Sequence, residues 1–157
     1  MKNFCFIILK PDALKRELAD AILDRFIKEG FSIEIIGYKK ATEPLIKEHY
    51  EEVIQRLGQA FEKQLANGLQ NEYVLPVILS HKSDDAITIG RKITGATDPS
   101  KADPGTIRGE FGQDSFELSA KEERFCNNLI HTCDSTQAYN KEINIWFGKN
   151  ISSKYKV

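Results

Sequence analysis

The chain opens with a strand-like segment that is apolar on both faces. Residues Phe4–Leu9 read Phe-Cys-Phe-Ile-Ile-Leu, and Lys10 and Pro11 follow at once. A strand with one wet face would alternate polar and apolar residues, so this run predicts a strand inside a sheet. The rest of the chain must therefore supply strands beside it and helices that cover it.

Helical and strand-like patterns alternate after this segment. The first expected elements are a helix through Leu18, Ile22 and Phe26 that ends at Gly30, a strand over Phe31–Ile35 and a helical stripe from Thr42 to Leu65. They are followed by a strand over Tyr73–Leu79, a helix through Ile87 and Arg91, and a long loop from Gly95 to Phe111. The last two elements are a strand that ends at His131 and a helix from Ser135 to Phe147. Pro76 indicates that the strand over Tyr73–Leu79 is an edge strand or carries a bulge.

This order predicts an α/β class fold, a ferredoxin-like α+β sandwich in which helices cover an antiparallel sheet. An added helix pair and a long active-site loop extend the basic pattern, and we expect residues 1–157 to form a single domain. Because such folds host RNA binders, small-molecule sensors and enzymes, the fold alone does not decide the function. An RNA-recognition module would also need a second aromatic strand and a basic surface, and neither pattern is present.

Composition narrows the functional classes further. The formal net charge is −1, which removes a general electrostatic case for nucleic acid or an anionic membrane. The three cysteines lack the spacing of a zinc site or a disulfide framework, and Cys5 is expected in the core. The apolar N-terminal run is too short for a signal sequence, and no segment has transmembrane length, so we expect a cytoplasmic protein.

The segment Asn128–Ser135 carries the strongest chemical signal. His131 ends a short apolar strand, and Glu142 lies on the following helix, from which it can turn back toward the ring. A carboxylate on one ring nitrogen fixes the tautomer and leaves the other nitrogen available as a nucleophile. Taken alone, a histidine in this position also fits an ordinary surface residue.

Three cations and a threonine accompany this histidine. Lys10 follows the first strand, while Arg91, Thr97 and Arg108 lie in and before the long loop. Guanidinium, ammonium and hydroxyl donors in this combination suit a polyphosphate. Each of them alone is equally compatible with a solvated surface residue.

Together, three motifs resemble the nucleoside diphosphate kinase family. They are Lys10-Pro11-Asp12, Gly105-Thr-Ile-Arg108-Gly and Asn128-Leu-Ile-His131-Thr-Cys-Asp134-Ser135. The resemblance implies ping-pong transfer of a γ-phosphoryl group from a nucleoside triphosphate to a nucleoside diphosphate through phosphohistidine at His131. Glu142 would orient the ring, and Lys10 would be the third catalytic residue. It also implies a homo-oligomer, a tetramer or hexamer built from dimers. Mg²⁺ would arrive on the nucleotide phosphates, with no metal ligand assigned to the protein.

The resemblance also implies a set of substrate-binding residues, among which Phe61 is the best candidate for stacking on the base. The set is Lys10, Tyr50, Phe61, Arg91, Thr97, Arg108 and Asn128.

Departures from the family pattern keep alternatives open. Cys133 replaces a serine, and Gly112–Cys126 is roughly ten residues longer than the usual connection, with Ser119-x-x-Glu122 predicting the start of a short helix. A family member that has lost turnover and serves as a nucleotide-binding or scaffold module is one alternative. A histidine phosphocarrier that receives its phosphate from a protein is another. His49 and His81 are interpreted as surface residues.

Overall fold

The computed structural model describes residues 3–157, and one antiparallel sheet organises them. The strands are β1 (Asn3–Leu9), β2 (Ser32–Ile36), β3 (Lys39–Lys40), β4 (Tyr73–His81) and β5 (Ile130–Thr132). Their order is β2-β4-β1-β5, and β3 pairs with the first two residues of β4, Tyr73 and Val74. This is the predicted ferredoxin-like α+β arrangement. Residues Cys5–Leu9 of β1 are buried, which confirms the interior strand.

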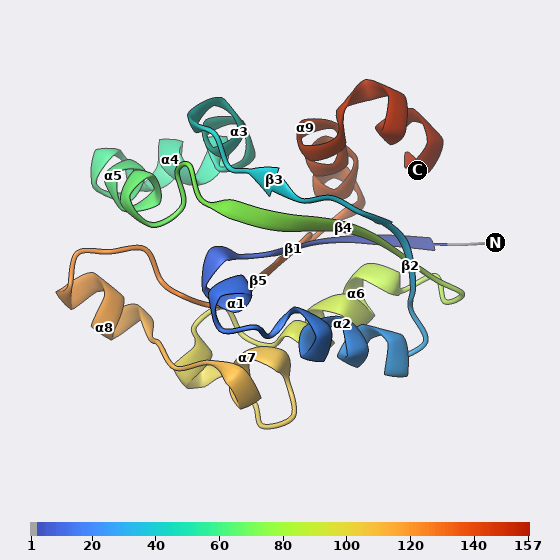
Figure 1. Ribbon diagram of the computed structural model, residues 1–157, viewed down its shortest axis with the longest axis horizontal. Helices are drawn as coiled ribbons and strands as arrows, with labels where there is room; N and C mark the ends of the chain where they lie inside the picture. Colours follow the sequence, from blue (N-terminus) through green and yellow to red (C-terminus); the bar gives the residue numbers. More distant parts are fainter. Residues whose placement is uncertain (1–2) are drawn as a thin grey trace.

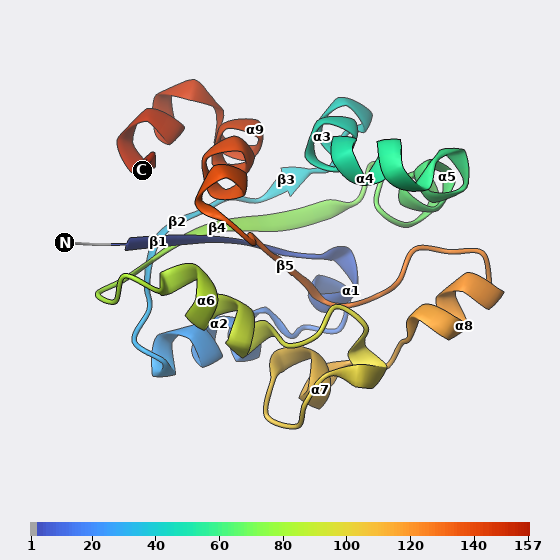
Figure 2. The same cartoon turned by 180° about the vertical axis from the view of Figure 1, so that it is seen from behind.

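Two helical layers cover the sheet (Figures 1 and 2). One layer contains α3 (Glu43–His49), α4 (Glu51–Leu57), α5 (Gln59–Gly68) and α9 (Thr136–Tyr155). The other contains α1 (Pro11–Lys15), α2 (Ala19–Lys28), α6 (Ala86–Thr94), α7 (Ile107–Phe111) and α8 (Phe116–Lys121), with a 3₁₀ turn at Pro99–Lys101. The largest fully buried side chains, among them Trp146, Tyr139, Phe6 and Phe26, fill the space between helices and sheet.

Several elements differ from the expectations. The helical stripe from Thr42 to Leu65 is three helices, because the chain bends at Tyr50 and at Gly58, whose φ is +80°. The last helix is regular up to Phe147, as expected, and a further helical segment that was not expected follows a break at Gly148, where φ is +79°, and extends to Tyr155. α1 begins directly after Lys10, since Pro11 is favourable in a first helical turn.

The expectation of an edge strand at Pro76 is wrong, because β4 lies between β1 and β2. Pro76 is instead opposite Gly37, in the gap where β2 ends and β3 has not begun, and its carbonyl accepts from the N–H of Gly37. A residue without an N–H loses little at a gap in the ladder. Within residues 3–157, no helix is both long and apolar enough to cross a bilayer.

Candidate active site

His131 is the middle residue of β5, where it pairs with Ile8 of β1. Its Nε2 lies 3.0 Å from Oε2 of Glu142, on the helix that follows. Ser135 begins that helix by accepting the N–H of Ala138, so strand and helix are joined by a short, fixed turn. The structure therefore confirms the prediction that Glu142 turns back toward the ring of His131.

The electrostatic surroundings keep the His131 ring neutral. Burial, followed by the nearby charges of Lys10 and Arg108, lowers the pKa of His131 to about 3. Burial raises the pKa of Glu142 to about 7, against an opposing effect of His49. With the Nε2 proton directed at Glu142, the lone pair of a neutral ring lies on Nδ1.

Lys10 is buried, and its ammonium is directed at the segment that precedes His131. Nζ donates to Oδ1 of Asn128 at 2.7 Å and to the carbonyl of Cys126 at 3.4 Å. It also lies 4.0 Å from the centre of the Phe125 ring. Burial lowers the pKa of Lys10 to about 8, while the carboxylate of Asp12 opposes this shift. Lys10 therefore remains a cation at neutral pH but with a small margin.

Arg108 supports the backbone of the same site. Its three guanidinium nitrogens donate to the carbonyls of Asn128, Gly95 and Ile130. Burial, followed by the charge of Arg91, lowers the pKa of Arg108 to about 10, so it stays charged. One side chain thereby connects the long loop to the strand that carries His131.

A cavity of about 580 Å³ opens in front of these residues. Seven of the predicted site residues line it: Lys10, Tyr50, Phe61, Thr97, Arg108, Asn128 and His131. Nδ2 of Asn128 donates to the carbonyl of Thr97, which closes one wall. Tyr50, Phe61 and Phe125 form an aromatic cluster with ring centres 6.1–6.2 Å apart. This volume lies in the range of ligand sites, and the aromatic wall suits a planar group.

Arg91 is the predicted cation that this cavity does not include. It is exposed on α6, donates from Nη1 to the carbonyl of Thr132, and lines a neighbouring hollow with Thr106. Its charge still acts on the site, because it contributes to the lowered pKa of His131.

The Gly112–Cys126 insertion forms a wall of the cavity through α8. Phe116, Ser119, Ala120, Arg124, Phe125 and Cys126 are among the lining residues. The predicted capping box at Ser119 and Glu122 is wrong: Ser115 caps the helix by accepting the N–H of Leu118, and Ser119 lies within it. Ser115-x-x-Leu118 has the capping hydroxyl but not the second acidic residue of a capping box.

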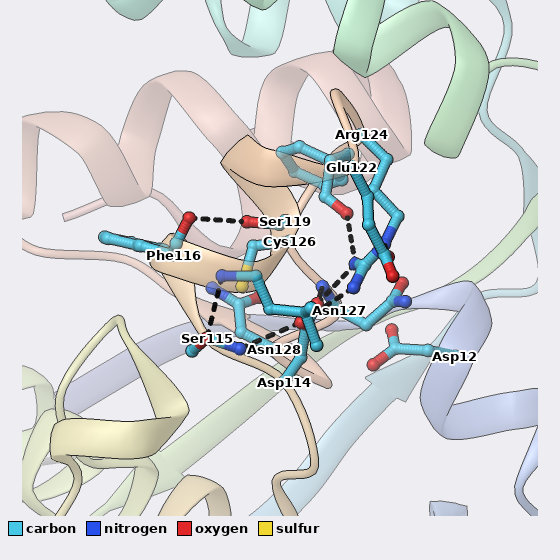
Figure 3. A network of polar contacts seen from close by, with 12 residues as sticks. Asp12, Asp114, Ser115, Phe116, Ser119, Glu122, Arg124, Cys126, Asn127 and Asn128 are labelled. Atoms are coloured by element: carbon cyan, nitrogen blue, oxygen red, sulfur yellow. Dashed lines mark hydrogen bonds and ion pairs between the residues drawn. The ribbon is translucent and has the colours of Figure 1, made fainter.

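An ion-pair cluster fixes the ends of the insertion (Figure 3). Both carboxylate oxygens of Asp114 accept from Arg124, at 2.6 and 2.9 Å, and they also accept the N–H groups of Ser115 and Asn127. Glu122 accepts from Nε of Arg124 at 2.6 Å. Although burial raises the pKa of Asp114, these hydrogen bonds outweigh it and hold the pKa at about 2.

Asp12 and Leu129 belong to the site, although pattern reasoning gave them no role. Leu129 has a φ of +73°, a conformation that bulky side chains rarely adopt. Oδ2 of Asp12 accepts its N–H at 3.0 Å, and the N–H of Lys10 donates to its carbonyl at 2.9 Å. This strained residue reverses the chain between Asn128 and His131, and the Lys-Pro-Asp motif holds it in place.

The surface interpretation of His49 is wrong. His49 is the last residue of α3, and its ring centre lies 4.5 Å from that of His131. Nε1 of Trp146 donates to its Nδ1 at 3.0 Å. The helical spacing from Ile46 to Tyr50 and the polar sequence around His49 gave no signal of this position, which tertiary packing decides. His81 is half-buried and contacts the carbonyl of Glu29 and the N–H of Ser83.

Cys133 is two residues after His131 in the sequence but faces the core. Its Sγ accepts the N–H of Phe6 at 3.3 Å and lies 3.9 Å from Sγ of Cys5. Both cysteines are fully buried, which confirms the expectation for Cys5. All three cysteines are free thiols.

The side chains that line the cavity indicate how a metal ion could be bound there. Of the described residues that line it, none is an aspartate or glutamate. Mg²⁺ prefers oxygen ligands and is commonly held by substrate phosphates with only one or two carboxylates. The lining therefore fits a magnesium ion that is carried by phosphates.

Comparison with known proteins agrees with this geometry. Residues 3–151 match the family model described as nucleoside diphosphate kinase. The nucleoside diphosphate kinase of Saccharomyces cerevisiae is 35% identical over 92% of this chain and 84% of its own length. That of Staphylococcus saprophyticus is 36% identical over 96% of this chain and 91% of its own length.

Two solved structures share the fold closely. A transition-state mimic of the nucleoside-diphosphate kinase from Borrelia burgdorferi, with bound vanadate and ADP, has a TM-score of 0.87 and 30% identity, covering 95% of this chain and 89% of that one. The enzyme from Halobacterium salinarum in complex with CDP has a TM-score of 0.79 and 27% identity, covering 96% and 90%. The chain belongs to the nucleoside diphosphate kinase family.

Proposed function

We propose that this protein is a nucleoside diphosphate kinase, a phosphotransferase that uses His131 as its phosphate carrier. The observation that carries the proposal is the His131 ring: Nε2 is engaged by Glu142, and the ring lines a cavity with Lys10 and Arg108. A neutral imidazole with a lone pair on Nδ1 is a competent nucleophile. Lys10, Arg108, His131 and the aromatic residues Tyr50 and Phe61 line one cavity, and Arg91 lies in a neighbouring hollow.

The transfer has two balanced steps. Nδ1 of His131 attacks the γ-phosphorus of a nucleoside triphosphate, the bond to the β–γ bridging oxygen breaks, and the diphosphate leaves with that electron pair. A terminal oxygen of a second nucleoside diphosphate then attacks the phosphorus, and the bond to Nδ1 breaks. Phosphoryl transfer depends on positioning and charge neutralisation, which Lys10, Arg91 and Arg108 are placed to provide.

The remaining ligands have roles that follow from their positions. Thr97 and Asn128 line the cavity beside Lys10, and Tyr50 and Phe61 form its aromatic side. We assign the first two to phosphate and sugar oxygens and Phe61 to the face of the base. Mg²⁺, held by the nucleotide phosphates, would neutralise charge on them. Among residues 3–157, the side chains that line the cavity include no carboxylate that would hold the ion alone.

The catalytic proposal is tested with γ-labelled ATP. We expect an acid-labile, base-stable label on His131, as for a phosphoramidate, and transfer of that label to an added diphosphate. His131→Ala should take up no label. A label on Ser135, or one that persists in His131→Ala, would contradict the assignment. A label that forms but does not leave to a diphosphate would favour a phosphocarrier, and binding without any label would favour an inactive nucleotide-binding module.

We also propose that the protein is a cytoplasmic homo-oligomer assembled from dimers, as a tetramer or hexamer, with residues 1–157 in a single domain. The three cysteines lack the spacing of a disulfide framework, which supports a reducing compartment. The exposed edge of β2 supports self-association, since Ile33 and Ile36 remain accessible on it. Nucleoside tri- and diphosphates are the expected partners, and we expect no membrane or specific nucleic acid partner.

A further inference from the structure

His49 packs against the ring of His131 on the side of the sheet that carries α3 and α9 (Figure 1). The two imidazole planes are almost perpendicular, at 82°, with centres 4.5 Å apart. Phe6 makes a second edge contact with His131, with centres 6.4 Å apart and planes at 61°. His131 is thus in contact with two rings while Glu142 engages its Nε2.

Trp146 determines where the proton of His49 lies. The indole Nε1–H is only a donor, and it donates to Nδ1 of His49 at 3.0 Å. Burial, followed by the nearby His131, lowers the pKa of His49 to about 3, so the ring is neutral at neutral pH. A neutral imidazole that accepts at Nδ1 carries its proton on Nε2.

The same residues resemble the ligand set of a zinc site, but Trp146 opposes that interpretation. Ligand atoms of His49, His131 and Glu142 all lie within 4.8 Å of one another. A metal ion on Nε2 of His49 would move the proton of the neutral ring to Nδ1, where it would face the N–H of Trp146. Two donors would then be opposed in a buried place, which is costly. The cluster is therefore organised around protons rather than a metal ion.

We propose that His49 is a positioning residue that holds the plane and tautomer of the His131 ring. This inference rests on the proposed function and extends it. Rotation of His131 about its Cβ–Cγ bond would exchange Nδ1 with a ring carbon in front of the cavity. The perpendicular ring of His49, itself fixed by Trp146, opposes this rotation and keeps Nε2 on Glu142. Outer partners of this kind typically change rate or affinity by about 10–100-fold.

Substitution of His49 separates positioning from ordinary packing. We expect His49→Ala to lower kcat by about tenfold at nearly constant KM. His49→Gln, whose amide oxygen can accept from Trp146, should recover part of the loss. The matched control is His81→Gln, which should retain wild-type kcat. His81 is a half-buried histidine, the last residue of β4, and it contacts Glu29 and Ser83.

The decisive readout is the ¹⁵N NMR spectrum of the His131 ring, which requires no catalysis. In the unsubstituted protein, Nε2 should resonate as a protonated nitrogen and Nδ1 as an unprotonated one. His49→Ala should shift both signals toward a mixture of tautomers, while His81→Gln should not. If His49→Ala does not fold, Trp146→Phe removes the donor to Nδ1 and should produce the same mixture.

Unchanged ¹⁵N signals and an unchanged kcat in a folded His49→Ala protein would overturn the proposal. A loss of kcat with unchanged ¹⁵N signals would also overturn it, because the residue would then act by another route. Failure of the proposed function is recognised separately: the unsubstituted protein would take up no label from γ-labelled ATP, whereas the tautomer comparison would still give its own answer.

Discussion

At the scale of single residues, the site depends on charged side chains that already form hydrogen bonds within the protein before any ligand binds. Arg108 gives its guanidinium to three backbone carbonyls, and Lys10 is committed to Asn128 and Cys126. Such contacts fix the charges in place, so little reorganisation is needed when phosphate binds. Burial is also why the pKa of Lys10 is unusually low, and this has a measurable consequence.

The activity should decline in mildly alkaline solution because of Lys10. Its pKa is about 8 in the free protein, lowered first by burial, opposed by Asp12 and Asp114 and assisted by Arg108. The ammonium is therefore present below pH 8 and is lost as the pH rises through that value. We expect kcat/KM to fall above pH 8 and kcat to fall only at higher pH, because bound phosphate raises the pKa of Lys10.

Steady-state rates between pH 6 and 10 test this expectation. Lys10→Gln should have a lower kcat/KM throughout and should lose the break near pH 8. If the break remains in Lys10→Gln, another group is responsible for it.

The buried thiols should be inert in the native protein. Cys133 is fully buried, with its Sγ beside Cys5 and the N–H of Phe6, so its thiol should be protected from oxidants. A hydroxyl can accept the same N–H, so Cys133→Ser should keep its activity. Titration with a chromogenic disulfide reagent should detect Cys5 and Cys133 only after unfolding. Fast modification in the native state, with loss of activity, would show that Cys133 is accessible.

At the scale of elements, the insertion that carries α8 is the feature most specific to this chain. Its two ends are joined by Asp114 and Arg124, and its inner side borders the cavity through Ser119, Phe125 and Cys126. The Phe61 and Phe125 ring centres are only 6.2 Å apart and the rings are inclined by 64°. A base between two parallel rings needs about 7 Å, twice an ordinary contact distance. A sandwiched base would therefore require the insertion to move.

Removing this wall should weaken nucleotide binding more than phosphoryl transfer. Replacement of residues 114–123 by a short glycine-containing turn should raise KM several-fold, with kcat within about twofold, because residues 114–123 include neither His131 nor any of the residues predicted to bind phosphate. Asp114→Asn should give a smaller change in the same direction by weakening the pair with Arg124. Glu122→Gln is the matched control, because the Glu122 carboxylate is half exposed and forms its ion pair with Nε of Arg124. A normal KM in the shortened protein would contradict a role in access.

The elements also show what the sequence could and could not predict. The interior position of β1, the strand that presents His131 and the helix that returns Glu142 follow from local patterns: an apolar run, a capping serine and helical spacing. His49 could not be found in this way, because its burial results from the packing of α3 on α9. Local pattern does not decide the start of α8, because both Ser115 and Ser119 can cap a helix. In the structure Ser115 has the extended backbone of an N-cap, and its hydroxyl accepts the N–H of Leu118.

At the scale of the whole molecule, the two edges of the sheet differ. β5 is the edge that carries the site, whereas β2 pairs with β4 on one side and, within residues 3–157, with no strand on the other. Exposed apolar side chains lie along and beside β2: Ile27, Ile33, Ile36 and Tyr38. An uncovered edge with apolar neighbours is a common surface for pairing with another chain. If a second copy of this protein paired along β2, as we propose, the active site at the opposite edge would stay free.

A charge on this edge should dissociate the proposed dimer. Ile36 is 47% exposed in the single chain, so Ile36→Lys should be tolerated by the fold, yet burying its ammonium in an interface would be unfavourable. We expect light scattering after size-exclusion chromatography to report a smaller species than for the unsubstituted protein, with the circular dichroism spectrum unchanged. Leu118→Lys is the matched control, because that leucine is 41% exposed and its helix, α8, lies at the opposite end of the molecule from β2 (Figure 1). If Leu118→Lys reduces the size and Ile36→Lys does not, the insertion rather than the β2 edge holds the subunits together.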